Sequence, residues 1–417
     1  MINIRKLSNG IRMVTEKIDH VQSVSIGIWV RAGARDEEPV VSGVSHFIEH
    51  MMFKGTEQRS AKQIAEDADK IAGQMNAFTG KEATCYYMKT LSSNAEKAAE
   101  ILIDMFTNSK FDKYEMGKEK KVIMEEMKMT NDTPDDVAHD TISELVFKGN
   151  PLSKSILGTK TSLKGISRDM LIDYIRKEYT KDSIVVSVSG NFDEERLCEM
   201  FNEGLANLPE KKELKVYEEV PYKPLYKSVV RDIEQAHICL GTRGVSTDDD
   251  MYHPFTILNN IMGGSMSSRL FQNIREEKGL AYSVYSMAST YSDMGYFNIY
   301  AGVASNRIEA AIGGISDELK RLRKDFVSQE ELDMAKEQLK GSYIFSQENV
   351  NSRMFAAGKN VVLFDKVYPL EDTIREIDSV TLDDLKAAAE LIWDIDKYSA
   401  VVVSGEKVNI KEIMRCQ

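Results

Sequence analysis

The chain has 417 residues, of which 42% are hydrophobic and 29% charged, so it has an ordinary globular composition and the length of about two domains. Its formal net charge of −12 disfavours nucleic acid as the main partner, because a phosphate backbone requires a basic surface. The widely spaced Cys85, Cys198, Cys239 and Cys416 argue against a disulfide framework or a zinc ribbon, and favour a reducing, cytoplasmic setting.

Segments for export or membrane insertion are not expected. The first 20 residues lack an apolar stretch of the signal-peptide type, and the longest apolar runs are strand-sized. A membrane-spanning helix requires about 18 apolar residues or more. We therefore expect no membrane partner. The acidic charge would suit a cationic partner, although solubility alone would also account for it.

The chain begins with an expected hairpin and a strand. Residues 2–7 and 11–16 flank Ser8-Asn9-Gly10, and Asn-Gly favours a tight turn with positive φ at both central residues. Residues 23–33 alternate between apolar and other side chains, which is typical of a half-buried strand.

Helices and further strands follow up to about residue 208, and their start and stop signals come from caps, glycines and periodicity. In order they are a helix over 44–56 ending near Gly55, a helix over 60–73 capped by Ser60, two strands within 74–91 joined at Gly80-Lys81, helices over 94–108 and 114–132, a strand over 182–193, and a helix to about 208.

A linker is expected near the middle of the chain. Residues 209–228 are rich in charge and proline and lack a clear period. They separate an N-terminal domain, residues 1–208, from a C-terminal domain, residues 229–417.

The second half resembles the first. Residues 236–245 can be laid on 23–33, where the match of Ile238 to Ile26 gives an offset of 212. Residues 397–406 can be laid on 183–192, where the match of Gly405 to Gly190 gives an offset of 215. Chance similarity between β-strands is the alternative for each match alone. Two nearly equal offsets argue for two homologous α+β domains, each a mostly antiparallel β-sheet packed with α-helices.

The stretch His46-Phe47-Ile48-Glu49-His50 carries a candidate metal site. Residues four apart lie on one face of a helix, so His46 and His50 can direct two imidazoles at one zinc ion. Glu49 flanks that face, where a carboxylate can accept a proton from a metal-held water. A surface helix with two histidines in no special role is the alternative.

A catalytic zinc takes three protein ligands and keeps one open position. A later predicted helix offers Glu119, Glu125 and Glu126. Glu119 and Glu126 are seven apart on one face, together with Val122 and Ile123, whereas Glu125 is turned about 100° away and is expected to be solvated. Glu126 is therefore the candidate ligand. Glu119 would lie behind or beside it as a supporting group, with a solvated charge as the alternative.

The repeat predicts that the second domain keeps the motif helix without its chemistry. An offset of 212 residues places the two histidines and the glutamate on Leu258, Ile261 and Met262. We therefore expect the N-terminal domain to bind metal and catalyse, and the C-terminal domain to bind no metal.

The run "GVSHFIEHMMFKGTEQRS" resembles the pitrilysin family of zinc metallopeptidases, which have the inverted motif H-x-x-E-H. It is most similar to the processing-peptidase branch, which includes the mitochondrial processing peptidase and its bacterial relatives. In that branch the third ligand is the last glutamate of a motif like E-x-x-V-I-x-x-E, which here runs from Glu119 to Glu126. Glu126 lies 76 residues after His50, which fits the spacing of the family. The resemblance covers about residues 2–406 and implies one Zn²⁺ per chain, held by His46, His50 and Glu126.

Other segments resemble the same family and imply substrate contacts. "LSNGIRMV" is similar to its opening hairpin, "MNAFTGKEATCYYMKTL" to its active-site strand, and "GGSMSSRLFQNIREEKGLAYSVYS" to the signature of its second domain. The implied substrate-binding residues are Phe53, Asn76, Ala77, Phe78, Arg275 and Tyr282. Phe53 would line the pocket just after the scissile bond, and the Arg–Tyr pair contacts substrate near the metal in relatives such as insulin-degrading enzyme. Ordinary core or surface positions are the alternative for each of them.

The resemblance implies a zinc-dependent endopeptidase that hydrolyses peptides or unfolded, presequence-like segments. Glu49 would take a proton from zinc-held water, and the hydroxide would attack a carbonyl that the metal polarises. Glu49 would then protonate the leaving amine.

The resemblance also implies a homodimer, or a heterodimer with a related subunit, in which Arg275 and Tyr282 serve the partner's zinc across a closed chamber. A non-catalytic scaffold or partner subunit, as in the respiratory cytochrome bc complex, is the alternative. Such relatives typically lack part of the metal motif, which is complete here.

Overall fold

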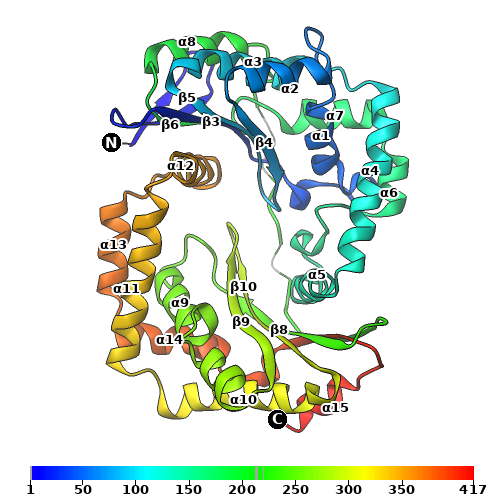
Figure 1. Cartoon of the computed structure of the whole chain (residues 1–417), viewed down its shortest axis with the longest axis vertical. Helices are drawn as coiled ribbons and strands as arrows, with labels where there is room; N and C mark the ends of the chain where they lie inside the picture. The colour runs from blue at the N-terminus through cyan, green and yellow to red at the C-terminus, as the bar shows by residue number, and fades with distance from the viewer. Residues whose placement is uncertain (1, 212–214, 219) are drawn as a thin grey trace. The chain divides into compact units, whose positions relative to one another are not determined.

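The computed structural model describes residues 2–211, 215–218 and 220–417, and the chain divides into two compact units (Figure 1). The first unit comprises Met1–Met127, Lys154–Tyr217 and Ile344–Pro369. The second comprises Lys128–Ser153, Glu218–Tyr343 and Leu370–Gln417.

The first unit is built on a six-stranded sheet in the order β1-β2-β6-β3-β5-β4. Its strands are β1 Ile2–Lys6, β2 Arg12–Lys17, β3 Ser23–Val30, β4 Gln74–Thr79, β5 Thr84–Leu91 and β6 Ile184–Gly190. The β2–β6 pair is parallel and the other pairs are antiparallel. Strand β4 lies at the edge, and among the described residues it pairs with β5 alone.

The second unit has a five-stranded sheet in the order β7-β11-β8-β10-β9. Its strands are β7 Tyr226–Val230, β8 Gln235–Gly244, β9 Ala281–Thr290, β10 Gly295–Ala304 and β11 Ser399–Ser404. The single parallel pair, β7–β11, takes the place of β2–β6 in the first sheet. The remaining pairs are antiparallel, so the second sheet repeats the topology of the first without a counterpart of the edge strand β1. The expected α+β fold with two similar domains is confirmed.

Helices cover both sheets. The first ones along the chain are α1 Val44–Met52, α2 Ala61–Lys70, α3 Ala95–Asn108, α4 Lys113–Asp132, α5 Pro134–Val146, α6 Lys160–Gly165, α7 Arg168–Glu178 and α8 Glu194–Gly204. The later ones are α9 Tyr252–Asn259, the π-helical η5 Asn260–Gly264 and η6 Phe271–Glu277, α10 Ile308–Asp325, α11 Gln329–Ser346, α12 Val350–Phe364, α13 Leu370–Ser379, α14 Leu382–Ile392 and α15 Ile410–Arg415. As expected, Ser60 caps α2, and its hydroxyl accepts a hydrogen bond from the Gln63 N–H.

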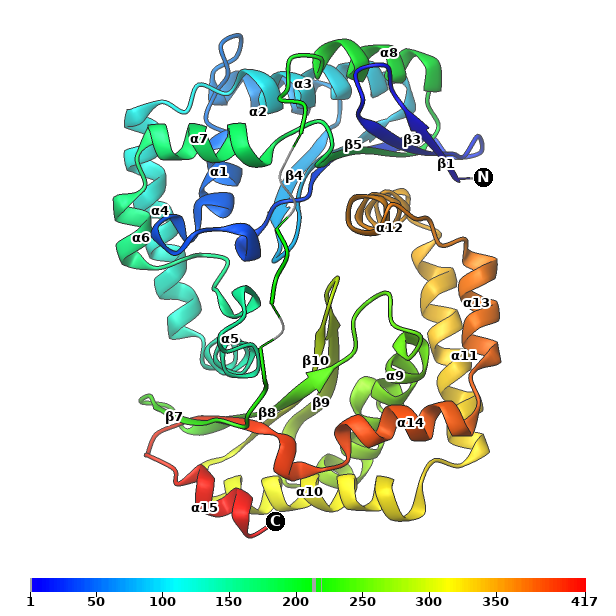
Figure 2. The ribbon, with the colours of Figure 1, turned by 180° about the vertical axis from the view of Figure 1, so that it is seen from behind.

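The two compact units do not coincide with the stretches 1–208 and 229–417. Helix α5 lies on the second sheet, where Ile142 fills the space beside Gly241, and α12 lies on the first sheet (Figure 2). Each unit therefore takes one helix from the other half of the chain, because each helix buries its apolar face on the sheet it contacts. Of the expected linker, residues 212–214 and 219 lie outside the described residues, and its last residues belong to β7.

Strand β3 is buried on both faces rather than half-buried. Its residues from Val24 to Val30 are all buried. Helix α3 contacts β3 and β5, and α12 packs against β3 and β6 on the other face. Alternation in the sequence could not predict α12 on that second face, because the helix comes from more than 300 residues later.

The opening hairpin has a longer loop than the expected tight turn. The pairing of Lys6 with Arg12 leaves a five-residue loop in which Gly10 has a φ of 95° and Asn9 has a negative φ. The Asn9 side chain instead accepts a hydrogen bond from the Ile11 N–H and donates to the Asn202 carbonyl on α8. That tertiary contact replaces the local turn chemistry.

Two further observations concern the apolar character of the helices and the state of the cysteines. None of the helices in the described part of the chain combines the length and apolar character needed to cross a lipid bilayer. The four cysteines are free, and three of them are buried.

Gly358 tests the packing of α12 on the first sheet. A Cβ at this position would lie 2.1 Å from Nε1 of Trp29, so Gly358→Ala should lower the free energy of unfolding by about 1–3 kcal/mol. The control is Gly117→Ala in α4, where a Cβ meets nothing within 4 Å and should raise stability by roughly 0.5–1 kcal/mol. Urea denaturation of both variants measures the difference, and equal stabilities would contradict this packing.

Candidate metal centre

Helix α1 carries both histidines of the motif and is held firmly in the first unit. Phe47, Ile48 and Met51 are buried in the core. Its N-terminal neighbour Gly43 has a φ of 89°, and a Cβ there would lie 2.6 Å from the Leu157 carbonyl oxygen. Glycine is therefore required where the chain enters this helix.

The structure brings the three predicted ligands together. The rings of His46 and His50 are 4.6 Å apart, as residues four apart on a helix should be. Glu126 on α4 faces both of them, with its Oε2 3.7 Å from Nε2 of His46 and 3.7 Å from Nε2 of His50. All three ligand atoms lie within 4.8 Å of one another, and within the described ranges no other such group of three forms.

The donor set fits a zinc ion. Bonds of 2.0–2.1 Å in tetrahedral geometry separate two ligand atoms by roughly 3.3 Å, so the 3.7 Å distances require only a small adjustment. Oε2 of Glu126 is buried and accepts no hydrogen bond from any residue in the described ranges. A buried carboxylate oxygen without a donor is costly unless a cation neutralises it. Two imidazoles and one carboxylate leave a fourth position open.

Glu119 contacts the ring nitrogen of His50 that faces away from Glu126. Its Oε2 lies 3.1 Å from Nδ1 of His50, and its Oε1 lies 2.8 Å from the Lys54 ammonium. The contact with Glu119 places the proton on Nδ1 and leaves the lone pair of Nε2 directed towards Glu126. Glu119 is 4% exposed, so it is not a solvated charge.

The inward face of α4 differs in one residue from the expected one. Met116, Glu119 and Ile123 are buried, whereas Val122 is 49% exposed. The buried face thus follows a spacing of three and four residues and excludes Val122. Glu125 is exposed, as expected.

Glu49 lies on α1 next to the three predicted ligands but is not part of their group. Its Oε2 accepts a hydrogen bond of 2.5 Å from the Thr79 hydroxyl. Burial raises the pKa of Glu49, and the hydrogen bond from Thr79 opposes part of that rise. Burial, together with the neighbouring His50, lowers the pKa of His46 to about 4, so His46 is neutral at neutral pH, the form in which imidazole can bind a metal.

Strand β4 turns the side chains of Ala77 and Thr79 towards the core and the helix α1. Ala77 is buried in the core and Thr79 reaches Glu49, so the side chains of Asn76 and Phe78 point to the opposite face of the sheet. There Phe78 packs edge-on against Phe355 of α12, with ring centroids 5.6 Å apart. Asn76 and Phe78 are both exposed, and the backbone of residues 76–78 lies at the open edge of the sheet.

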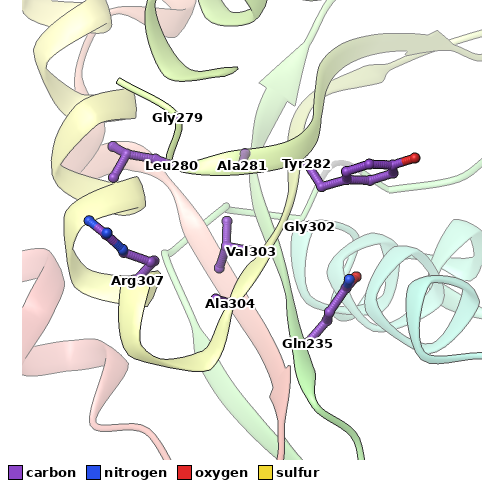
Figure 3. Close-up of a pocket in the computed structure, with 9 residues that line it drawn as sticks. All are labelled: Gln235, Gly279, Leu280, Ala281, Tyr282, Gly302, Val303, Ala304 and Arg307. Atoms are coloured by element: carbon purple, nitrogen blue, oxygen red, sulfur yellow. The ribbon is translucent and has the colours of Figure 1, made fainter. Parts of the chain in front are cut away.

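The other expected substrate residues lie in two places. Phe53 follows α1 and is half-buried against the core of the first unit. In the second unit Arg275 and Tyr282 contact each other, with the guanidinium carbon 5.7 Å from the centre of the tyrosine ring. Tyr282 is 78% exposed and borders a cavity of about 370 Å³ that Arg307 lines on its far side (Figure 3).

The positions that the sequence repeat assigns to the motif in the second unit are apolar and buried. Leu258, Ile261 and Met262 are buried in the apolar core of that unit. The motif helix is represented there by α9 and by the π-helical turn η5, so its shape is altered as well as its chemistry.

Three residues near the centre escaped the sequence analysis. Lys54, four residues after His50, had a helical signal that places it on the same face. Thr79 and Glu37 had no such signal, because each reaches α1 through tertiary packing. Thr79 lies on β4 and donates a hydrogen bond to Glu49. Glu37 lies in the loop before α1 and accepts hydrogen bonds from the first backbone N–H groups of the helix.

Comparisons with known proteins cover almost the whole chain. Residues 12–160 match the family model described as Insulinase (Peptidase family M16), and residues 165–339 match the model described as Peptidase M16 inactive domain. An uncharacterized zinc protease of Bacillus subtilis, YmxG, is 41% identical over 97% of this chain and 98% of its own length. An uncharacterized zinc protease of Rickettsia felis is 37% identical over 96% of this chain and 97% of its own.

Two solved structures share the fold at 20% sequence identity. A structure from Pseudomonas fluorescens, described as a peptidase M16 inactive domain, has a TM-score of 0.90 and covers 97% of this chain and 98% of its own. A protease from Helicobacter pylori has a TM-score of 0.89 and covers 97% of this chain and 99% of its own.

Glu126→Gln tests the assignment of the third ligand. Loss of the carboxylate should weaken zinc binding by about 100-fold or more, since the amide leaves the site without its anionic ligand. Glu125→Gln, one residue earlier and exposed, is the control and should bind zinc as the unchanged chain does. Competition with a chromophoric chelator measures both affinities, and equal values for the two variants would contradict the assignment.

Proposed function

The chain belongs to peptidase family M16, and from this premise we propose that it is a zinc-dependent endopeptidase with its metal held by His46, His50 and Glu126. The observation that carries the proposal is the convergence of two imidazole nitrogens on a buried carboxylate oxygen that accepts no hydrogen bond within the described ranges. The zinc-protease names of the relatives support it. Within the family we place the chain in the processing-peptidase branch, on the inverted motif and the spacing of Glu119 and Glu126.

Zinc, when bound to these residues, would supply a Lewis acid that acidifies a water molecule and polarises a peptide carbonyl. The chain's own residues prepare for this. His46 is neutral, His50 is held in one tautomer by Glu119, and Lys54 balances the charge of Glu119.

Glu49 is the proposed general base and then the general acid. A carboxylate beside the ligands can accept a proton from the attacking water and return it to the nitrogen of the leaving amine. Burial, which raises its pKa, makes it a better proton acceptor than an exposed glutamate. The Thr79 hydroxyl orients one of its oxygens.

The proposed substrates are peptides or unfolded, presequence-like segments. The edge strand β4 can pair through its backbone at residues 76–78 with an extended chain, which selects shape rather than sequence. Phe53 would contact the residue after the scissile bond. Arg275 and Tyr282 would contact substrate as a pair, as their mutual contact supports.

We also propose a homodimer, or a heterodimer with a related subunit, in which Arg275 and Tyr282 serve the partner's zinc. The proposed location is the cytoplasm, a proposal supported by the four free and widely spaced cysteines. Neither nucleic acid nor membrane is a proposed partner.

Glu49→Gln tests the mechanism. The variant should bind zinc like the unchanged chain but cleave a quenched peptide about 10²–10⁴-fold more slowly, because the amide cannot accept the proton. Glu125→Gln serves again as the exposed control and should keep full activity. Full cleavage by Glu49→Gln would refute the role of Glu49. Stoichiometric zinc in the unchanged chain, with no cleavage of any peptide in a library, would favour the scaffold instead.

Thr79 tests the orientation of Glu49. Thr79→Val keeps the shape but removes the hydroxyl donor, so kcat should fall about tenfold, which corresponds to the loss of one hydrogen bond to a charged group. Thr79→Ser retains the donor and should recover most of the activity. Identical kcat values for Val and Ser at this position would show that the hydrogen bond has no catalytic part.

A further inference from the structure

Glu37 is a buried carboxylate outside the ligand set that faces the N-terminus of α1. It is 2% exposed. Its Oε2 accepts a hydrogen bond of 2.6 Å from the Gly43 N–H, and its Oε1 accepts one of 2.9 Å from the Ser45 N–H. The first N–H groups of a helix have no acceptor within it, and a carboxylate there also interacts favourably with the helix dipole.

We propose that Glu37 is a positioning residue for the metal centre, which fixes α1 so that His46, Glu49 and His50 keep the geometry the reaction needs. The inference rests on the proposed function and adds to its centre a residue that lies nine positions before His46, ahead of α1. Glu37 itself touches none of the proposed ligands.

The entrance to α1 explains why an external carboxylate is required. Gly43 lies where a capping side chain normally stands, but the left-handed backbone and the close Leu157 carbonyl admit only glycine there. The helix therefore cannot cap itself. Glu37 instead provides the acceptors for the N–H groups of Gly43 and Ser45, which lie six and eight residues after it. Ser45 is the residue immediately before His46.

Ser45 adds a second contact that holds the first turn of α1. Besides its N–H bond to Glu37, its hydroxyl lies 2.9 Å from the Tyr174 hydroxyl of α7. Ser45 precedes His46 directly, so these two contacts act next to a proposed ligand. Because α1 has only nine residues, a tilt of its first turn would also displace His50.

The loop that carries Glu37 is itself anchored. The Lys154 ammonium donates to the Glu37 carbonyl. Asp36 accepts a hydrogen bond of 2.9 Å from the Tyr217 hydroxyl, and Arg35 pairs with Glu82 at 2.7 Å. Glu37 is therefore fixed relative to the sheet, and it can transmit that position to α1.

A purely structural role for Glu37 is the competing interpretation, and the two differ in what they predict. A capping residue that only stabilises the fold changes the free energy of unfolding and leaves the metal centre of folded molecules unchanged. A positioning residue changes the metal affinity and kcat of the folded protein, because displacements of about 0.5 Å already impair a catalytic constellation.

The experiment compares Glu37→Gln with Glu38→Gln in the full chain. The glutamine has the shape of glutamate, but its NH₂ group would face one of the two N–H donors. Glu37→Gln should therefore lose about tenfold in zinc affinity and about tenfold in kcat, with KM within twofold. The visible absorption of the cobalt-substituted protein should also shift. Glu38 is exposed and pairs at the surface with Lys177 at 3.3 Å, so Glu38→Gln should match the unchanged chain.

The outcomes separate the two proposals. Wild-type zinc affinity, kcat and cobalt spectrum in folded Glu37→Gln would overturn the positioning role, even if that variant unfolds at a lower temperature. Failure of the unchanged chain to bind zinc would instead overturn the proposed function.

Folding is checked by circular dichroism in the presence of chelator. If Glu37→Gln is unfolded, Glu37→Asp decides, because its shorter side chain keeps the charge but reaches only one of the two N–H groups. Wild-type zinc affinity and kcat in Glu37→Asp, or an unfolded chain in both variants, would show that Glu37 serves folding and not positioning.

Discussion

The first unit is arranged around an imbalance of charge between α1 and α4. Glu49, Glu119 and Glu126 gather beside two imidazoles, and Lys54 is the one cation that contacts them among the described residues. Carboxylates without enough neighbouring positive charge are unfavourable in a buried setting, and burial, with a smaller contribution from Glu126, raises the pKa of Glu49. A divalent cation held by these residues would offset the excess negative charge, which agrees with the proposed zinc site.

Helix α1, which carries most of this cluster, is held by contacts along its length and at both ends. Helix α1 is short, but its apolar face is buried, its first turn is tied to Glu37, and its end is tied through Lys54 to Glu119 on α4. Strand β4 adds Thr79 from the edge of the sheet. The proposed base therefore depends on one residue of the sheet, and the proposed ligands depend on two helices and one loop.

The two units show how one topology can hold or lack this chemistry. Apart from the additional edge strand β1 of the first sheet, both sheets have the same order with one parallel pair each. The second unit has Leu258, Ile261 and Met262 at the positions that the sequence repeat assigns to the motif. Apolar side chains there join the core and need no cation. Each sheet is completed by a helix from the other half of the chain, α12 for the first and α5 for the second, so neither half of the sequence contains all of the unit built on its own sheet.

The sequence alone determined whatever depends on helical periodicity and on the repeat. Residues four and seven apart lie on one face of any α-helix, which is why His46 with His50 and Glu119 with Glu126 could be paired before the fold was known. Two matching offsets similarly indicated two similar sheets. Tertiary structure alone decided that β3 is covered on both faces, that Val122 points outwards, and that Thr79 and Glu37 reach the motif helix. These features depend on contacts between segments that are far apart in the sequence. Packing brings such segments together, and packing, unlike local backbone geometry, produces no periodic pattern in the sequence.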